Sequence, residues 1–287
     1  MQPFFCNLKT IGMQEIEYEI VAKKNFGFGF RELWEHKELL YSFSWRDIKV
    51  KYKQTALGFL WAILQPTILM LIFTYALGSY IKANSKLSID YSVFALSGLL
   101  LWAIFSSGVS GAGNSMISNA EIIKKIYFPR LIIPISSVIV SLFDFCMAFP
   151  VFCVILLFKH TGFNVYAILF VPASLLLAGF STLGIGTGLS ALNLKYRDFK
   201  YVMPFMIQAL MFLSPVVYPI SEGDTGWLKY IMAVNPMKLP LDLFRMSISG
   251  YNGGCSLWMI SSISSLLFFI LGFYYFRKTE NYFSDLA

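Results

Sequence analysis

The side chains that most often catalyse reactions or bind metal ions are few and scattered in this sequence. There are two histidines, His36 and His160, and four cysteines, and no CxxC or His-x-x-x-His spacing brings any of them together. Zinc sites and disulfide frameworks depend on such spacings. No GxxxxGK[ST] phosphate-binding loop occurs, and the glycines Gly184, Gly186 and Gly188 lie in a charge-free stretch. We therefore expect no catalytic site, metal site or cofactor site in this chain.

Asp144 is the one charged residue in the apolar stretch from Leu131 to Phe158. A carboxylate inside a membrane is costly unless it is paired or hydrated, which makes Asp144 a candidate for a functional group. Two other interpretations stay open. Asp144 could pair with Ser137 or Ser141 on its own helix, or it could lie nearer the membrane surface than the middle of the stretch.

The composition places these residues in a membrane. Only 14% of the 287 residues are charged, 57% are hydrophobic, and the mean hydropathy is +0.64. Soluble domains carry about 25% charged residues, and one soluble core of this length could not bury so many apolar side chains. An ordinary cytosolic enzyme is therefore excluded. The first residues show no cleaved signal peptide.

Six stretches are long and apolar enough to cross the roughly 30 Å hydrocarbon core of a bilayer as helices. They predict an all-α polytopic membrane protein with six transmembrane helices. The expected spans are residues 56–80, 92–114, 132–158, 165–192, 201–220 and 256–276, within a transmembrane domain of residues 54–276. In the fourth span, Gly184 and Gly188 suit close helix packing. General tolerance of glycine in membrane helices is the alternative.

The positive charges indicate which ends of the spans face the cytoplasm, because short cytoplasmic loops are enriched in Lys and Arg. With a cytoplasmic N-terminus, 17 of the 23 Lys and Arg residues fall on the cytoplasmic side. Both termini are therefore expected inside the cell, as an extension of residues 1–30 and a tail of residues 277–287. Topology alone explains the net charge of +7, so we expect no nucleic-acid partner.

Residues 31–53 are predicted to form an amphipathic helix before the first span. Five apolar residues recur at helical spacings on one face: Trp34, Tyr41, Trp45, Ile48 and Tyr52. The basic residues lie off the centre of this stripe, as in helices that lie in the headgroup plane with an aromatic face in the membrane. A soluble helix packed on a partner is the alternative.

Residues 119–130, between the second and third spans, form a second candidate contact region. They read NAEIIKKIYFPR, with Ile122, Ile123 and Ile126 on one side and Pro129 as a stop signal. An apolar ridge flanked by cations on the cytoplasmic face suits docking of a partner protein. The alternative is packing on the chain's own amphipathic helix.

Residues 222–254, on the outer side, are too charged to form a seventh span. Two short apolar pieces, residues 227–234 and 241–248, are separated by Asn235, Pro236 and Pro240. Because proline rarely lies inside a helix, these pieces predict two short re-entrant helices. A structured outer loop is the alternative.

Seven blocks of the sequence together resemble the membrane subunit of ABC exporters for O-antigen, capsular polysaccharide and teichoic acid. The blocks are KVKYKQTALGFLWAILQP (49–66), SGLLLWAIFSS (97–107), IIKKIYFPR (122–130), SALNLKYRDFK (190–200), LSPVVYP (213–219), NP (235–236) and the C-terminal FRKTENYFSDL. Each block alone is weak evidence, but seven in the same order and at matching topological places are strong evidence.

The resemblance implies a six-span subunit that forms a homodimer and binds two copies of a separately encoded ATPase, which would hold ATP and Mg. It implies an amphipathic helix, a cytoplasmic docking loop and two re-entrant helices at the places described above. The implied docking residues are Glu121, Ile122, Lys124, Lys125, Ile126, Tyr127 and Arg130. The implied residues of the outer gate are Trp227, Tyr230, Asn235, Pro236 and Phe244.

The first and fifth spans would line the conduit in a protein of this kind. Aromatic side chains there could stack on sugar rings, whereas most aromatics in membrane helices face lipid or a neighbouring helix. The conduit candidates are Trp61, Tyr75, Phe205, Phe212 and Tyr218.

The implied activity is ATP-driven export of a lipid-linked polysaccharide across the bacterial inner membrane, without covalent chemistry in this chain. Four cations before the first span lie at the right depth for a phosphate or pyrophosphate headgroup: Arg46, Lys49, Lys51 and Lys53. Binding to anionic membrane lipids is the alternative role for them. Two other functions stay open, namely export of a drug or small lipid by the same architecture, and a polytopic enzyme of glycan assembly.

Overall fold

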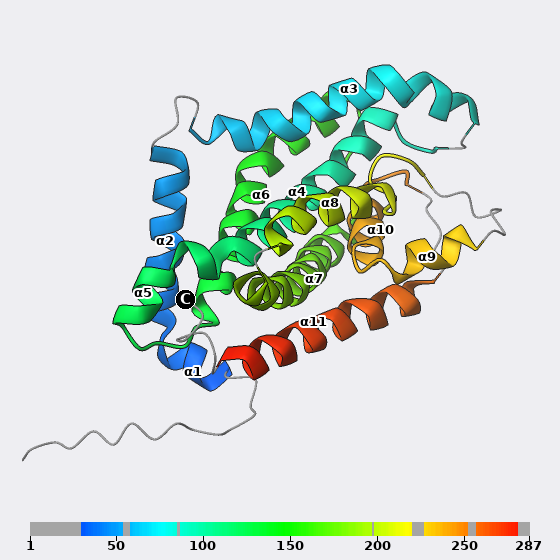
Figure 1. The fold of residues 1–287 in the computed structure, drawn as a ribbon. Coiled ribbons are helices and arrows are strands. Elements are labelled where there is room, and N and C mark those ends of the chain that lie inside the picture. The colour runs from blue at the N-terminus through cyan, green and yellow to red at the C-terminus, as the bar shows by residue number, and fades with distance from the viewer. Residues whose placement is uncertain are drawn as a thin grey trace, which may run out of the picture.

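The computed structural model describes residues 30–53, 58–84, 87–196, 198–219, 227–251 and 257–280. Within these ranges the regular elements are all helices and no strand occurs, which confirms the predicted all-α class (Figure 1). The helices are α1 (Phe30–Glu35), α2 (Lys37–Lys53), α3 (Leu60–Asn84), α4 (Tyr91–Ser118), α5 (Ala120–Lys125), α6 (Ile132–Phe158), α7 (Ala167–Lys195), α8 (Phe199–Phe212), α9 (Leu228–Val234), α10 (Lys238–Met246) and α11 (Trp258–Glu280). The predicted extension of residues 1–30 and the end of the predicted tail lie almost entirely outside the described ranges.

Among the described residues, five helices are long and apolar enough to cross a membrane, namely α3, α4, α6, α7 and α11. The predicted fifth span, residues 201–220, differs from the structure, because it is helical only within α8. A helix of 14 residues rises about 21 Å, which is short of the bilayer core. Pro215 and Pro219 follow its end, and residues 213–218 form turns and bends, so the chain leaves the helix early. The count of six spans therefore stays a prediction.

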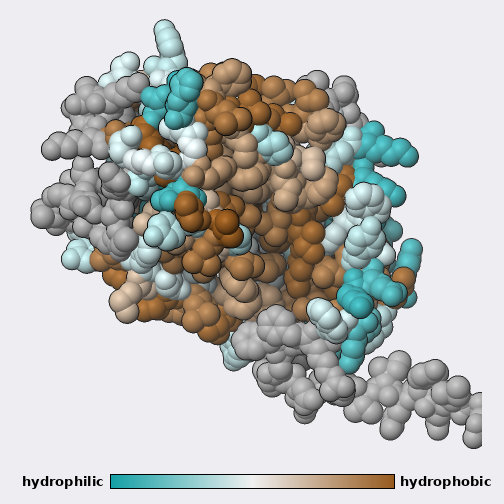
Figure 2. All heavy atoms as spheres, turned by 180° about the vertical axis from the view of Figure 1, so that it is seen from behind, coloured by the Kyte–Doolittle hydropathy of each residue, from teal (hydrophilic) through white to brown (hydrophobic). Residues whose placement is uncertain are grey.

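The surface agrees with a membrane location. Figure 2 shows a broad hydrophobic area over the middle of the molecule, with hydrophilic residues gathered at its edges. Large apolar side chains of α3, α7 and α11 are exposed. In a bilayer such side chains would face lipid or another subunit, so their exposure is the expected result for spanning helices.

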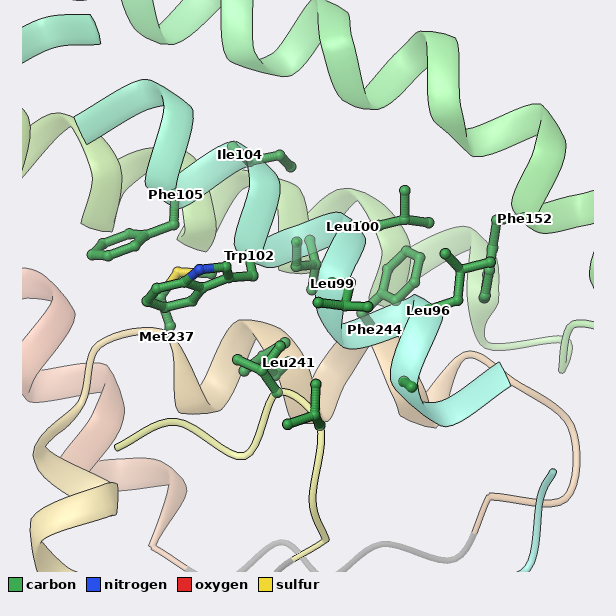
Figure 3. Packing of buried hydrophobic residues seen from close by; sticks show 14 of the residues in the cluster. Leu96, Leu99, Leu100, Trp102, Ile104, Phe105, Phe152, Met237, Leu241 and Phe244 are labelled. Atoms are coloured by element: carbon green, nitrogen blue, oxygen red, sulfur yellow. The ribbon is translucent and has the colours of Figure 1, made fainter. Parts of the chain in front are cut away.

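Helix α4 is the centre of the molecule, and it packs against α3, α6, α7, α8 and α10. Its side chains form most of the core drawn in Figure 3, where Trp102 and Phe105 of α4 lie near Met237, and Leu96 and Leu100 lie near Phe244 of α10. Because α4 carries no charged residue, it can be surrounded by other helices on every side.

Helices α7 and α11 approach each other closely at three glycines. A Cβ atom on Gly272 would lie 1.8 Å from the carbonyl oxygen of Gly184, and one on Gly184 would lie 2.5 Å from the Cα of Phe269. A Cβ on Gly188 would lie 3.3 Å from the Cα of Gly272. The predicted close packing at Gly184 and Gly188 is therefore confirmed, because a larger residue would separate the two backbones.

The segment predicted as one amphipathic helix, residues 31–53, consists of α1 and α2 with a turn at His36. The Nδ1 atom of His36 lies 2.9 Å from the carbonyl oxygen of Glu32, within the turn where the helix breaks. Figure 1 shows α2 at one end of the bundle, running across the direction of α3 and α11. This is the orientation of a helix that lies along a membrane surface.

Helices α1 and α2 have one face packed on the protein and one face exposed. Phe43 is buried in a cluster that includes Phe128 and Ile132, whereas Trp34 and Tyr41 are exposed. The first part of the predicted stripe, with Trp34, Tyr41 and Trp45, therefore faces outward, as lipid contact would require. The stripe turns inward at its end, where Tyr52 contacts Asp144 of α6.

Candidate functional site

A polar cavity lies between α2, α4 and α6, and we call it the serine cavity. Its volume is about 530 Å³, within the range of roughly 300–1,000 Å³ that ligand pockets occupy. Helix α2 contributes two cations, Arg46 and Lys51, to its wall. Helices α4 and α6 contribute serines to the opposite wall: Ser107, Ser115, Ser118, Ser137 and Ser141. Asn119 and Ile122, which belong to the predicted docking loop, also line the cavity.

A second, more apolar cavity adjoins the first, and we call it the tryptophan cavity. It measures about 260 Å³ and lies between α3, α4, α6 and the end of α2. Trp61, Gln65 and Trp102 are part of its wall. Lys51 and Ser107 line both cavities, so the two spaces meet at these residues.

Asp144 lies at this junction and is paired with α2. The Nζ atom of Lys51 is 2.5 Å from Oδ2 of Asp144, and the hydroxyl of Tyr52 donates to Oδ1. The hydroxyls of Ser137 and Ser141 instead donate to backbone carbonyls of α6, so pairing of Asp144 on its own helix is not what the structure shows. The sequence indicated that this carboxylate is costly unless it is paired or hydrated, but it did not indicate Lys51 as the partner.

Tyr52 stays protonated in this position. Burial raises the pKa of its phenol, and the hydrogen bond to Asp144 raises that pKa further because it stabilises the protonated form. The phenol is therefore a permanent donor to the carboxylate at neutral pH.

The four cations that were predicted to bind a headgroup have different environments in the structure. Arg46 donates to Asp47 at 2.7 and 2.9 Å and to Oδ1 of Asn119 at 2.9 Å, and it lines the serine cavity with Lys51. Lys49 lies 5.4 Å from the ring centre of Trp45. Lys49 and Lys53 are exposed and are not among the residues that line the serine cavity.

The predicted docking loop, residues 119–130, forms the short helix α5 followed by an extended stretch to Pro129. Only part of the predicted apolar ridge is exposed. Ile123 is buried, and Phe128 packs on Phe43 of α2 at 5.5 Å between ring centres, so part of the loop packs on the amphipathic helix. Ile126 and Tyr127 are exposed, Tyr127 to 88%, and remain available to a partner.

The charged residues of this loop have two different environments. Glu121, Lys124 and Lys125 are exposed. Arg130 donates to the carbonyl oxygen of Glu280 at the end of α11, which fixes the loop to the last helix.

The outer region contains the two predicted short helices, α9 and α10, at the end of the bundle opposite α5 (Figure 1). Their corner is held by hydrogen bonds. The side-chain amide of Asn235 donates to Ser214 at 2.6 Å, and its oxygen accepts from the N–H of Met237 at 2.9 Å. The carbonyl oxygen of Pro236 accepts from Ser265 at 3.0 Å.

The aromatic conduit candidates lie in different places. Trp61 lines the tryptophan cavity. Tyr75 on α3 and Phe205 and Phe212 on α8 are exposed on the surface. Tyr218 is partly buried, and its hydroxyl donates to the carbonyl oxygen of Phe212. A single chain therefore does not bring these five side chains together.

The sequence of the chain matches a known protein family. The sequence profile of the ABC-2 type transporter family matches residues 38–248, which includes both cavities and the outer corner. The chain belongs to the ABC-2 type transporter family. The resemblance drawn from the seven sequence blocks is thereby confirmed.

Several relatives of this ABC-2 type chain are curated. The O-antigen export system permease protein RfbA of Klebsiella pneumoniae is 26% identical over 93% of this chain and 99% of the relative. The protein of the same name from Myxococcus xanthus is 29% identical over 72% of this chain and 78% of the relative. The polysialic acid transport protein KpsM of Escherichia coli is 26% identical over 82% of this chain and 91% of the relative.

Two predictions about the outer region of the ABC-2 type chain need correction. Phe244 was expected at an outer gate, but it is fully buried against Phe145, Phe149 and Phe152, so it anchors α10 in the core. Pro240 was expected to break the segment, but it lies in the first turn of α10, where no intrahelical N–H is required. Trp227 and Tyr230 are exposed, whereas Asn235 and Pro236 are buried at the corner.

Arg245 of α10 is a buried cation whose structural role the sequence did not indicate. It is fully buried and donates to the carbonyl oxygens of Pro215 and Val216, each at 2.6 Å. Its guanidinium lies 3.6 Å from the ring centre of Phe94. Arg245 therefore ties α10 to α4 and to the proline-rich turn after α8. A lone arginine in an apolar outer segment was the signal that could have found it.

Proposed function

We propose that this chain is the permease subunit of an ATP-driven exporter that moves a lipid-linked polysaccharide of the O-antigen type across the bacterial inner membrane. It acts as a homodimer with two copies of a separately encoded ATPase, and both of its termini face the cytoplasm. The observation that carries this proposal is the match to an O-antigen export permease over 99% of that relative's length. A match of this extent covers the cytoplasmic, membrane and outer parts alike.

The docking loop is suited to transmit movement from the ATPase to the serine cavity. Tyr127 and Ile126 offer an apolar contact, flanked by Glu121, Lys124 and Lys125. Phe128 packs on α2, and α2 is linked to α6 because the hydroxyl of Ser136 donates to Asp47 at 3.2 Å. A push on α5 therefore moves α2, which forms one wall of the cavity, and so biases the subunit between closed and open states.

The cations of α2 that face the serine cavity are assigned to the substrate headgroup. These are Arg46 and Lys51, whereas Lys49 and Lys53 point elsewhere. An anionic headgroup in the inner leaflet would meet these two cations at the cytoplasmic end of the spans.

The exposed aromatic faces of α3 and α8 are assigned to the conduit. Tyr75 and Phe205 are exposed on a single subunit. In a dimer, the second subunit would enclose these aromatic side chains in a conduit between the two copies. At the outer end, Trp227 and Tyr230 of the short-helix region are assigned to the exit, with the Asn235–Pro236 corner as its fixed support.

The proposal is tested by deleting the gene in the bacterium that encodes it and measuring lipid-linked glycan on both sides of the inner membrane. Deletion should leave the glycan inside, and the chain supplied with its neighbouring ATPase should restore it at the cell surface. The purified pair should form a two-plus-two complex that hydrolyses ATP. Normal surface glycan in the deletion strain, or a chain that recruits no ATPase while folded, would overturn the proposal.

A further inference from the structure

The serine cavity has two chemically different walls. The α2 wall carries the cations Arg46 and Lys51 together with Asp47, and the α4 and α6 walls carry hydroxyls. Ser107 donates to the carbonyl of Ala103 at 2.7 Å, Ser115 to Ala112 at 2.6 Å, and Ser141 to Val138 at 2.7 Å. A hydroxyl whose proton is engaged still presents oxygen lone pairs, so this wall accepts hydrogen bonds. Sugar hydroxyls are donors of the matching kind.

The two cations of the other wall differ in how firmly they are held. Arg46 is neutralised by Asp47 and also donates to Asn119. Lys51 has Asp144 as its ion-pair partner, and its side chain is 44% exposed. Asp144 is only 14% exposed, so Lys51 is the member of the pair that a ligand can reach.

We propose that the serine cavity binds the sugar phosphate at the lipid-proximal end of the transported glycan, and that Lys51 exchanges Asp144 for this phosphate. The inference rests on the proposed function and adds the chemistry of recognition to it. The phosphate contacts Lys51, and the hydroxyls of the attached sugar donate to the serines of α4 and α6. A diphosphate linkage between lipid and sugar brings more acceptor oxygens and more charge than one carboxylate, so it can compete with Asp144 for Lys51.

Tyr52 makes the exchange possible without leaving Asp144 unsatisfied. The phenol donates to the other carboxylate oxygen, so Asp144 keeps one hydrogen bond after Lys51 leaves. Lys51 also belongs to both cavities, so its movement changes the connection between the serine cavity and the tryptophan cavity. Binding of the phosphate is thereby linked to the passage of the group toward Trp61 and Gln65.

The test measures binding to the chain in nanodiscs of neutral phosphatidylcholine. The probe is a short polyprenyl diphosphate that carries one N-acetylglucosamine, compared with the same diphosphate without sugar, a neutral polyprenyl glycoside and inorganic phosphate. Lys51→Gln should weaken binding of the glycosylated probe by about tenfold, since it removes one charge-assisted hydrogen bond. Asp144→Asn should strengthen it several-fold, because the competing carboxylate is gone. Lys53→Gln, outside the cavity, is the matched control and should bind as the wild type does.

The opposite signs at Lys51 and Asp144 separate exchange from a purely structural ion pair, which would be weakened by either change. Equal weakening by both variants, or wild-type binding by Lys51→Gln, would overturn the inference. Lys51→Arg should retain binding, which excludes misfolding as the cause of the loss. Ser141→Ala with Ser137→Ala should reduce the preference for the glycosylated probe over the sugar-free diphosphate; an unchanged preference would overturn the sugar contact.

Two further arms identify the source of the phosphate and isolate the inference from the proposed function. Adding phosphatidylglycerol to the nanodiscs should leave probe binding unchanged; competition at equal mole fraction would show that an ordinary anionic lipid occupies the cavity and would overturn the inference. The surface-glycan assay is run on the same variants. If the wild-type chain exports glycan while the binding results fail, only the inference is lost.

Discussion

Arg245 shows how much one buried side chain can hold together. Its hydrogen bonds to Pro215 and Val216 satisfy two buried carbonyls in the turn that follows α8. Arg245→Met keeps an unbranched, largely apolar side chain and removes these donors. Each unsatisfied buried carbonyl costs about 1–3 kcal/mol, so we expect the apparent melting temperature in detergent to fall by at least about 5 °C.

Lys200→Met is the matched control for that experiment, because Lys200 is an exposed cation on the neighbouring α8. It should leave the melting temperature unchanged within about 1 °C, as surface substitutions usually do. Equal shifts for both variants would show that the hydrogen bonds of Arg245 are dispensable.

At the level of single residues, the need for a partner could be predicted but its identity could not. The cost of a membrane carboxylate follows from Asp144 and its apolar neighbours alone. Its partner Lys51 lies in another helix, and only packing of α2 on α6 brings the two together. The same holds for Phe244: the pattern showed an aromatic residue in an outer helix, and only the tertiary fold shows it buried against α6.

The packing of α7 on α11 belongs to the scale of the element. Gly272→Ala places a Cβ 1.8 Å from the carbonyl oxygen of Gly184, so the helices must separate. We expect destabilisation of about 1–3 kcal/mol, the usual cost of overpacking, seen as a lower melting temperature and a lower folded yield.

Gly179→Ala, on the partner helix α7, is the control, because no neighbouring heavy atom lies within 4 Å of its added Cβ. Alanine also loses less conformational entropy than glycine in a helix, so this variant should be as stable as the wild type or slightly more stable. A melting temperature for Gly272→Ala as high as that of Gly179→Ala would contradict the close approach.

The docking loop gives a prediction about a partner surface. Tyr127 is 88% exposed, so Tyr127→Ala should not change the stability of the chain alone. If Tyr127 is a central contact for the ATPase, its truncation costs about 2 kcal/mol of binding, which is roughly a thirtyfold loss of affinity. Titration of the ATPase against the chain in nanodiscs measures this. Tyr166→Ala, exposed at the opposite end, should bind the ATPase normally.

Element positions were largely predictable, and element ends were less so. The charge-free runs located α3, α4, α6, α7 and α11 because each must supply enough apolar length for a bilayer. The early end of α8 and the break at His36 depend on local turn geometry, which hydropathy does not report. The two short outer helices were found from their prolines, although the helix start at Lys238 precedes Pro240.

On the scale of the whole molecule, the charge asymmetry predicted an orientation, and the fold is compatible with it. The cation-rich α2, α5 and the end of α11 lie together at one end, and α9 and α10 lie at the other (Figure 1). The two cavities could not be predicted, because each is formed by helices that are distant in sequence. Periodicity assigns a residue to a helix face, but the neighbour of that face is decided by packing.

Cysteine labelling tests both the orientation and the number of spans. In a background with the four native cysteines replaced by alanine, single cysteines are placed at Tyr127, Val165 and Trp227, all of which are exposed. Because positive charge stays inside, Val165→Cys and Trp227→Cys should react with a membrane-impermeant maleimide in intact spheroplasts. Tyr127→Cys should react only after the membrane is permeabilised. Reaction at Val165→Cys together with protection at Trp227→Cys would mean that α8 and its proline-rich turn do not cross the membrane, leaving five spans and a C-terminus on the outer side.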